Sequence, residues 1–211
     1  MSKLTDQLSQ NLINHRDYPL VKSVEANTWY TGRDLEEDVA ALRDQFAEQK
    51  IGAGDQVLIA LPNSPVFLPL NQALWEIGAV AHPIAAKTPL PELLAEWETY
   101  HYQAVITLPA VGKSLEAPLV PWEKVQLHTI SELAILTDAS QLAYRINAPQ
   151  ARPQEDDLAL ILNTSGTTGK PKRVGLTHRM LLNAALHDAK SHELSPDDTA
   201  MVVMPMFHIN A

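Results

Sequence analysis

Cysteine is absent from the 211 residues of this chain. Its absence excludes a disulfide framework, a thiolate metal site and a thiol nucleophile, and is typical of a cytoplasmic protein. Basic residues are also scarce, with 16 Lys and Arg against 25 Asp and Glu and a formal net charge of −9. This balance argues against a nucleic-acid backbone or an acidic membrane surface as the main partner.

Long apolar runs are missing as well. No segment is long and apolar enough to span a bilayer, and residues 1–10 lack the apolar centre of a signal peptide. His101, His187 and His192 show no metal-ligand spacing, so we predict no structural metal. With 45% hydrophobic residues, the chain can still bury a core as one large or two small domains. We expect a soluble, cytoplasmic protein with no transmembrane segment and no nucleic-acid partner.

Helix and strand signals alternate in the first half of the chain. Thr31 with Asp34 predicts the start of a helix, and Asn63 and Ser64 are candidate caps for another through about Ile77. Strands are predicted over 57–61, 80–84 and 104–108, with a short helix over 91–97. This β-α-β-α-β order predicts an α/β fold, with a mostly parallel sheet flanked by helices.

The second half carries the more specific pattern. Residues 110–147 show short strand-like pieces and no motif, and the composition of 148–153 indicates a linker. We therefore divide the chain into an α/β subdomain over 1–147, a linker over 148–157, and a last segment over 158–211. That segment is predicted as strand 158–162, a loop, strand 174–177, a helix and a final strand over 200–204.

The loop between the first two of these strands is rich in glycine, hydroxyl groups and lysine. Its sequence is Thr164-Ser165-Gly166-Thr167-Thr168-Gly169-Lys170-Pro171-Lys172. Glycine lets backbone N–H groups approach an anion, Ser and Thr add hydroxyl donors, and Lys adds charge, so this composition suits a polyphosphate. It is not the P-loop of nucleoside triphosphatases, because Thr164 replaces the first glycine and Pro171 replaces the Ser or Thr after Lys170. A flexible surface loop rich in Gly and Thr is the alternative interpretation.

The nine-residue string resembles the signature loop of the AMP-forming adenylating enzymes, most of all that of the acyl-CoA synthetases. Other segments resemble family motifs in the expected order. They are Trp29 to Thr31, Gly52 to Val57, Leu61 to Ser64, Gly78 to Val80, Thr177-His178 and Pro205 to His208. Three residues depart from the family pattern. Arg173 and Ala211 stand where the family usually has Gly, and Met180 stands where it usually has Asn.

The resemblance implies the N-terminal part of the large domain of an adenylate-forming enzyme. The implied reaction uses ATP, Mg²⁺ and CoA, and converts a carboxylic acid to an acyl-adenylate and then to a thioester. The implied catalytic residues are Lys170, Thr167 and His208, although His208 could instead be a core histidine. The implied nucleotide-binding residues are Thr164, Ser165, Gly166, Thr167, Thr168, Gly169, Lys170 and Lys172.

Roles other than direct phosphate binding are considered for Lys172, Arg173 and His178. Lys172 and Arg173 are either further phosphate contacts or, as we favour, solvated charges. We expect His178 to be structural and to tie the second strand to the loop.

Alternatives to an acyl-CoA synthetase remain at this point. The chain could be a non-catalytic domain that binds nucleotide, pyrophosphate or a partner protein. Within the family, the acyl acceptor could be a carrier protein, or oxygen could be used as in luciferases. Later family motifs are absent from these residues, so we expect an N-terminal fragment without complete turnover of its own.

Overall fold

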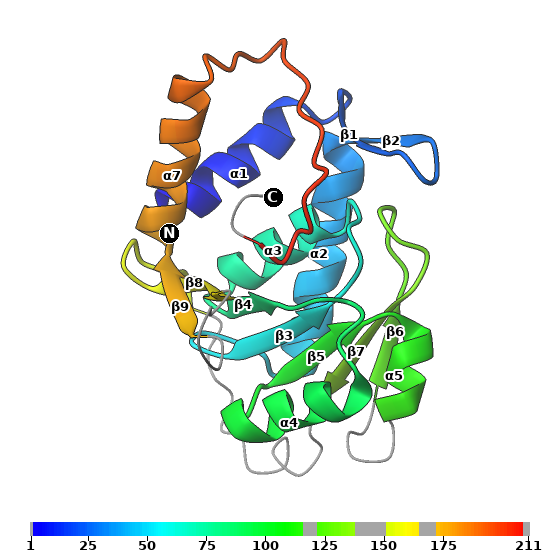
Figure 1. The fold of residues 1–211 in the computed structure, drawn as a ribbon. Helices are drawn as coiled ribbons and strands as arrows, with labels where there is room; N and C mark the ends of the chain where they lie inside the picture. The colour runs from blue at the N-terminus through cyan, green and yellow to red at the C-terminus, as the bar shows by residue number, and fades with distance from the viewer. Residues whose placement is uncertain (1, 116–121, 138–150, 165–171, 209–211) are drawn as a thin grey trace.

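The computed structural model describes residues 2–115, 122–137, 151–164 and 172–208 as one α/β unit (Figure 1). The helices are α1 (Lys3–Asn14), α2 (Gly32–Glu48), α3 (Phe67–Glu76), α4 (Leu90–Tyr100), α5 (Pro109–Leu115) and α7 (His178–Ser191). The strands of the first half are β1 (Pro19–Ser23), β2 (Thr28–Thr31), β3 (Gln56–Ala60), β4 (Val80–Pro83) and β5 (Ala104–Thr107). The later strands are β6 (Trp122–Val125), β7 (Leu133–Thr137), β8 (Leu158–Asn163) and β9 (Arg173–Thr177).

A seven-stranded sheet with the order β6-β7-β5-β3-β4-β8-β9 forms the centre of the molecule. Its middle strands β5, β3, β4 and β8 are parallel neighbours. The remaining pairs, β5 with β7, β6 with β7 and β8 with β9, are antiparallel, so only β7 and β9 point against the rest. The expected α/β fold with flanking helices is confirmed, and the sheet is mixed, with parallel strands at its centre and reversed strands near both edges.

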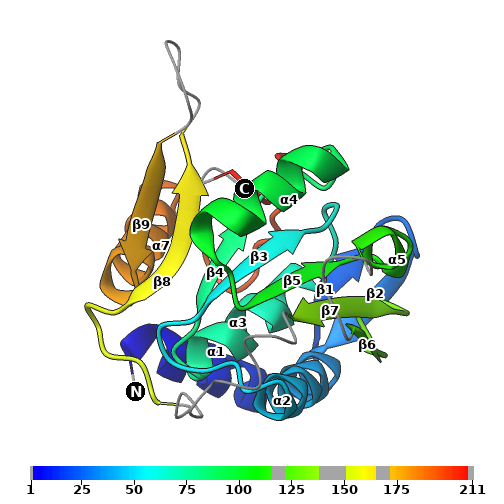
Figure 2. The same cartoon turned by 90° about the horizontal axis from the view of Figure 1, so that it is seen from below.

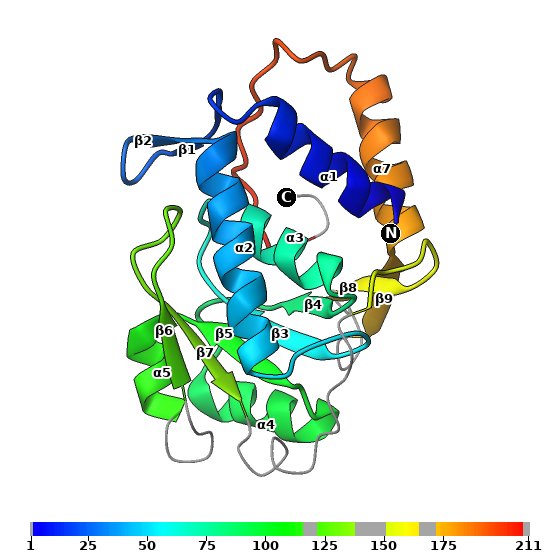
Figure 3. The same cartoon turned by 180° about the vertical axis from the view of Figure 1, so that it is seen from behind.

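Each face of the sheet carries its own apolar core. In β3, Val57 and Ile59 pack into one core with α2 and α3, whereas Leu58 and Ala60 pack into the other with α4. Successive side chains of a strand point to opposite faces, so a strand that is buried on both faces is apolar throughout. Figure 3 shows α1, α2 and α3 on one side of the sheet and α4 and α5 on the other.

The start of α2 is set by the predicted local signal. Thr31 Oγ1 accepts from the Asp34 backbone N–H at 3.2 Å, and the Thr31 backbone N–H donates to Asp34 Oδ2 at 2.7 Å. This reciprocal capping box satisfies two donors that a helix start would otherwise leave without partners. Farther along α2, buried Asp38 accepts from the backbone N–H groups of His128 and Thr129 and so ties the β6–β7 turn to this helix.

Two predicted helices have different bounds in the structure. The helix expected from Asn63 begins only at Phe67, and no side chain caps it, so the predicted caps are wrong. The helix expected over 91–97 runs from Leu90 to Tyr100. Helix α1 and the β1–β2 hairpin were not predicted; Ser2, whose hydroxyl accepts from the Thr5 N–H, was the available signal for α1.

The final strand predicted over 200–204 is wrong. Those residues form no strand, and the side chains of Met201 to Met204 are exposed. A strand needs a neighbour for its backbone N–H and C=O groups, and apolar β-branched residues alone do not supply one.

The linker over 148–157 falls partly outside the described residues, and the division of the chain into subdomains stays a prediction. Within the ranges given above, no helix has both the length and the apolar character needed to cross a membrane.

Candidate functional site

The two ends of the Gly/Thr loop are held together by the β8–β9 hairpin. Asn163 pairs with Arg173 as the last register pair of the two strands. One residue farther, the Thr164 N–H donates to the Lys172 carbonyl at 2.8 Å, and the Lys172 N–H donates to Thr164 Oγ1 at 3.3 Å. The predicted strand–loop–strand hairpin is therefore present, and both of its end residues are exposed to solvent.

Most of the predicted site residues lie outside the described residues. These are Ser165, Gly166, Thr167, Thr168, Gly169 and Lys170. Thr164, Lys172 and His208 are described, and of these only Thr164 and Lys172 are joined by a hydrogen bond. The roles assigned to all nine positions stay predictions.

The segment that carries His208 is held by the side chain of Asn63. Asn63 Nδ2 donates to the Met204 carbonyl at 2.7 Å, and Asn63 Oδ1 accepts from the Met206 N–H at 2.8 Å. The His208 N–H then donates to the Pro205 carbonyl at 3.0 Å, which closes a turn and leaves the imidazole exposed beside Phe207. His208 is thus not a core histidine. Asn63, which we expected to cap a helix, instead binds the backbone of Met204 and Met206.

The loop end of the hairpin at Thr164 and the Asn63 contact lie at the same edge of the sheet. Asn63 follows the carboxyl end of β3, and Thr164 follows the carboxyl end of β8. Strands β3, β4 and β8 are parallel, so their carboxyl ends face the same way. Open α/β sheets bind ligands beyond the carboxyl ends of their parallel strands, so this edge is the favoured position for a site.

Arg173 is not the solvated charge that we favoured from the sequence. Its Nη2 donates to Gln56 Oε1 at 2.7 Å, and its guanidinium carbon lies 3.8 Å from the centre of the Tyr100 ring. The hairpin is therefore attached to β3 and α4 through this side chain. Lys172, next to it, remains exposed as expected.

A buried polar group lies beside Arg173. The Tyr102 hydroxyl donates to Glu96 Oε1 at 2.9 Å and also makes a short hydrogen bond with His82 Nδ1. Burial, together with the positive charge of Arg173, lowers the pKa of His82 from 6.5 to about 4. Burial and the Glu96 carboxylate raise the pKa of Tyr102 well above its usual range. His82 is therefore neutral near pH 7. Its hydrogen bond to Tyr102, together with that of Tyr102 to Glu96, joins β4 to α4.

His178 is structural, but it connects different elements from those we expected. It is fully buried at the start of α7, and its Nδ1 lies 3.0 Å from Ser2 Oγ. Its ring also meets Trp75 of α3 edge-on, with 6.3 Å between ring centres. His178 thus joins α7 to α1 and α3 instead of tying β9 to the loop.

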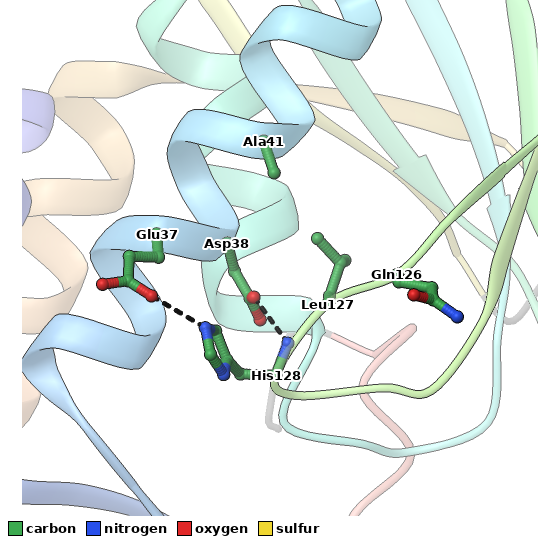
Figure 4. Close-up of a pocket in the computed structure, with 6 residues that line it drawn as sticks. All are labelled: Glu37, Asp38, Ala41, Gln126, Leu127 and His128. Atoms are coloured by element: carbon green, nitrogen blue, oxygen red, sulfur yellow. Dashed lines mark hydrogen bonds and ion pairs between the residues drawn. The ribbon is translucent and has the colours of Figure 1, made fainter.

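One pocket lies at the opposite edge of the sheet from β9. It has a volume of about 370 Å³ and is lined by Glu37, Asp38, Ala41, Gln126, Leu127 and His128 (Figure 4). Its polar groups already bind one another, with Asp38 on the His128 N–H at 2.7 Å and Glu37 on the His128 ring at 2.9 Å. Figure 2 shows β6 and the β8–β9 hairpin at opposite ends of the sheet, so this pocket is separate from the two strands of the hairpin.

Curated relatives of the chain are CoA ligases. The sulfoacetate–CoA ligase of Cupriavidus necator is 31% identical over 202 residues, which cover 92% of this chain and 38% of the relative. The crotonobetaine/carnitine–CoA ligase of Escherichia coli is 31% identical over 199 residues, with 86% and 37% covered. The chain thus spans well under half the length of these relatives.

Solved structures share the fold. MatB from Rhodopseudomonas palustris with bound ATP superposes with a TM-score of 0.72 at 22% identity, over 95% of this chain and 40% of that one. The o-succinylbenzoate CoA synthetase from Bacillus subtilis with ATP and magnesium has a TM-score of 0.71 at 22% identity, over 100% and 52%. At this identity, the likeness shows the fold alone.

The family model described as AMP-binding enzyme matches residues 8–211. This range contains the hairpin, the Gly/Thr loop and the segment held by Asn63. The chain therefore belongs to the AMP-binding enzyme family, the family of AMP-forming adenylating enzymes.

Proposed function

We propose that this chain is the phosphate-binding part of an ATP-dependent acid–thiol ligase that acts as an acyl-CoA synthetase. The observation that carries the proposal is the β8–β9 hairpin, which closes at Thr164 and Lys172 around the Gly/Thr loop. The family match and the CoA ligases among the relatives support the reaction type.

The proposed reaction has two steps. A carboxylate oxygen attacks the α-phosphorus of ATP, the bond from that phosphorus to the bridging oxygen breaks, and pyrophosphate leaves. The sulfur of CoA then attacks the acyl carbon, AMP leaves with the bonding electrons, and the thiol proton passes to solvent. The acid, the choice of CoA as acceptor and the cytoplasmic location all belong to this proposal.

The loop residues would act on the leaving pyrophosphate. Charge grows on its oxygens as the bond breaks, so donors aimed there stabilise the transition state more than the ground state. We assign this role to the backbone N–H groups of 166–169, the hydroxyls of Ser165, Thr167 and Thr168, and the ammonium group of Lys170. His208 would line the path of the carboxylate and the thiol. Within the described residues, no group of three or more His, Asp or Glu side chains could hold a metal, so we assign none to Mg²⁺.

The test is acid-dependent exchange of labelled pyrophosphate into ATP by the complete protein that contains this chain. The acid panel would include sulfoacetate, crotonobetaine and carnitine, because relatives are named for them. Replacing Lys170 by Met should lower the exchange rate about 100-fold, the effect of losing one such donor. Lys190→Met, at an exposed position of α7, is the matched control and should leave the rate unchanged.

Each result of that test decides between the hypotheses. Exchange with any acid, lost in the Lys170 variant, supports the ligase. Nucleotide or pyrophosphate binding without exchange for any acid would favour a non-catalytic binding domain instead. We expect residues 1–211 alone to give no complete turnover, because catalysis needs groups that close on the substrate from both sides.

A further inference from the structure

Arg173 connects the end of the Gly/Thr loop to the main body of the sheet. It is the first residue of β9, directly after Lys172, and it pairs with Asn163 across the hairpin. Its side chain leaves the hairpin and reaches Gln56 at the start of β3, 117 residues away in sequence. No other described side chain of β9 donates to or accepts from another strand of the main sheet.

The contact combines a hydrogen bond with aromatic stacking. Arg173 Nη2 donates to Gln56 Oε1 at 2.7 Å, and the guanidinium carbon lies 3.8 Å from the Tyr100 ring centre and 5.5 Å from that of Tyr102. A planar guanidinium can stack on a ring and donate in its own plane at the same time, which an ammonium group cannot do. The stacked geometry therefore fixes the direction of the side chain.

The charge of Arg173 is held without an acidic partner in the part of the chain that the structure describes. Among the described residues, no carboxylate forms an ion pair with it, and its Nε lacks a hydrogen-bond partner although it is buried. An arginine kept in such a position is held by the aromatic face and by Gln56. It loses these contacts if the hairpin moves away from α4 and β3.

Arg173 adds to the attachment of the hairpin at its loop end, where the Asn163 side chain of β8 also interacts with His82 of β4. Strand β8 pairs with β4 at a single register position, Ala81 with Leu160. At the other end of β8, Trp75 Nε1 donates to the Ala159 carbonyl at 2.8 Å. The residues nearest the loop, Asn163 and Thr164, lie beyond both contacts and are opposite Arg173 and Lys172.

We propose that Arg173 is a positioning residue that holds the loop end of the hairpin, where Thr164 pairs with Lys172, in place against the sheet, and that it thereby sets the affinity for the triphosphate of ATP. The proposal rests on the proposed function, because it takes the loop as the phosphate site. Arg173 itself is not proposed to contact the phosphates, because that role is assigned to the donors of the Gly/Thr loop.

The first measurement is amide hydrogen exchange in the 211-residue chain. Arg173→Met keeps the bulk of the side chain but removes the donor and the plane, and should speed exchange of the Thr164 N–H by about tenfold. Exchange in β3, such as at Leu58, should stay unchanged. Arg179→Met is the matched control, because Arg179 pairs with Asp156 on the exposed surface at 2.8 Å. Unchanged exchange at Thr164 in Arg173→Met would overturn the proposal.

The second measurement separates positioning from mere stability, using pyrophosphate exchange by the complete protein. Arg173→Met should raise the KM for ATP about tenfold and leave the KM for the acid unchanged. Tyr100→Leu should act in the same direction, and Arg173→Lys should recover only part of the loss. If the wild-type protein is active and the Arg173→Met variant has the same KM for ATP, the role of Arg173 is overturned but the proposed function stands. A wild-type protein without exchange for any acid would overturn the proposed function and this inference with it.

Discussion

At the scale of single residues, His82 is a histidine held in a fully buried position. Its imidazole is fully buried in β4 and faces the Tyr102 hydroxyl, with Glu96 and Arg173 close by. Both side chains are buried, so a charge on either would be removed from water at a large cost in free energy, and both are neutral. This arrangement stabilises the contact between α4 and the sheet near neutral pH.

Acid should therefore destabilise the fold through His82. Its folded pKa is about 4, below the ordinary 6.5, so between these values the unfolded chain binds a proton that the folded chain does not. The free energy of unfolding should fall as pH drops through this window, by up to about 3 kcal/mol in total. Urea unfolding at several pH values between 7 and 4 would measure the slope.

A matched pair of variants isolates the contribution of His82. His82→Gln should show a shallower slope, whereas His187→Gln, at an exposed position of α7, should keep the wild-type slope. Burial also lowers the pKa of His178, so part of the slope should remain in His82→Gln. An identical slope in His82→Gln and wild type would contradict this assignment.

At the scale of elements, two glycine turns set the entry to β3 and β4. Gly54 and Gly78 both have positive φ, at +81° and +78°, and the Gly54 N–H donates to the Gly78 carbonyl at 2.9 Å. They differ in their surroundings. A Cβ at Gly54 would meet nothing within 4 Å, whereas one at Gly78 would lie 2.8 Å from the Ala151 carbonyl oxygen.

Alanine at these two positions should have unequal costs. Gly54→Ala should lower the free energy of unfolding by about 1 kcal/mol, from the left-handed backbone alone. Gly78→Ala should lower it by about 3 kcal/mol, because the methyl group must also displace backbone. Chemical denaturation of both variants would test this, and equal costs would show that the Ala151 segment moves away freely.

At the scale of the whole molecule, the consecutive apolar residues Met201 to Met204 are all exposed. Met201 and Val203 are 78% and 74% exposed, and Leu186, Leu194, Val202 and Met204 are also exposed. Val24, in the turn between β1 and β2, is 78% exposed but has no such neighbours in sequence. Clustered apolar surface drives association, whereas isolated apolar residues are common on protein surfaces.

Polar replacement of the cluster should reduce self-association of residues 1–211. The double variant Met201→Ser, Val203→Thr should associate less in sedimentation experiments and bind less apolar dye. Its free energy of unfolding should change by no more than about 0.5 kcal/mol, because both side chains are exposed. Val24→Thr is the control and should leave association unchanged. If the double variant associates as strongly as the wild type, Met201 and Val203 do not drive self-association.

The sequence by itself determined the features that depend on near neighbours. The capping box of α2, the apolar strands buried on both faces, the hairpin around the Gly/Thr loop and the family resemblance all follow from residues close together in the chain. Only the tertiary structure decided that Asn63 holds the 204–206 segment, that Arg173 stacks on Tyr100, and that residues 200–204 form no strand. Contacts between residues more than 70 positions apart leave no periodic pattern in the sequence, because they depend on which strands and helices become neighbours.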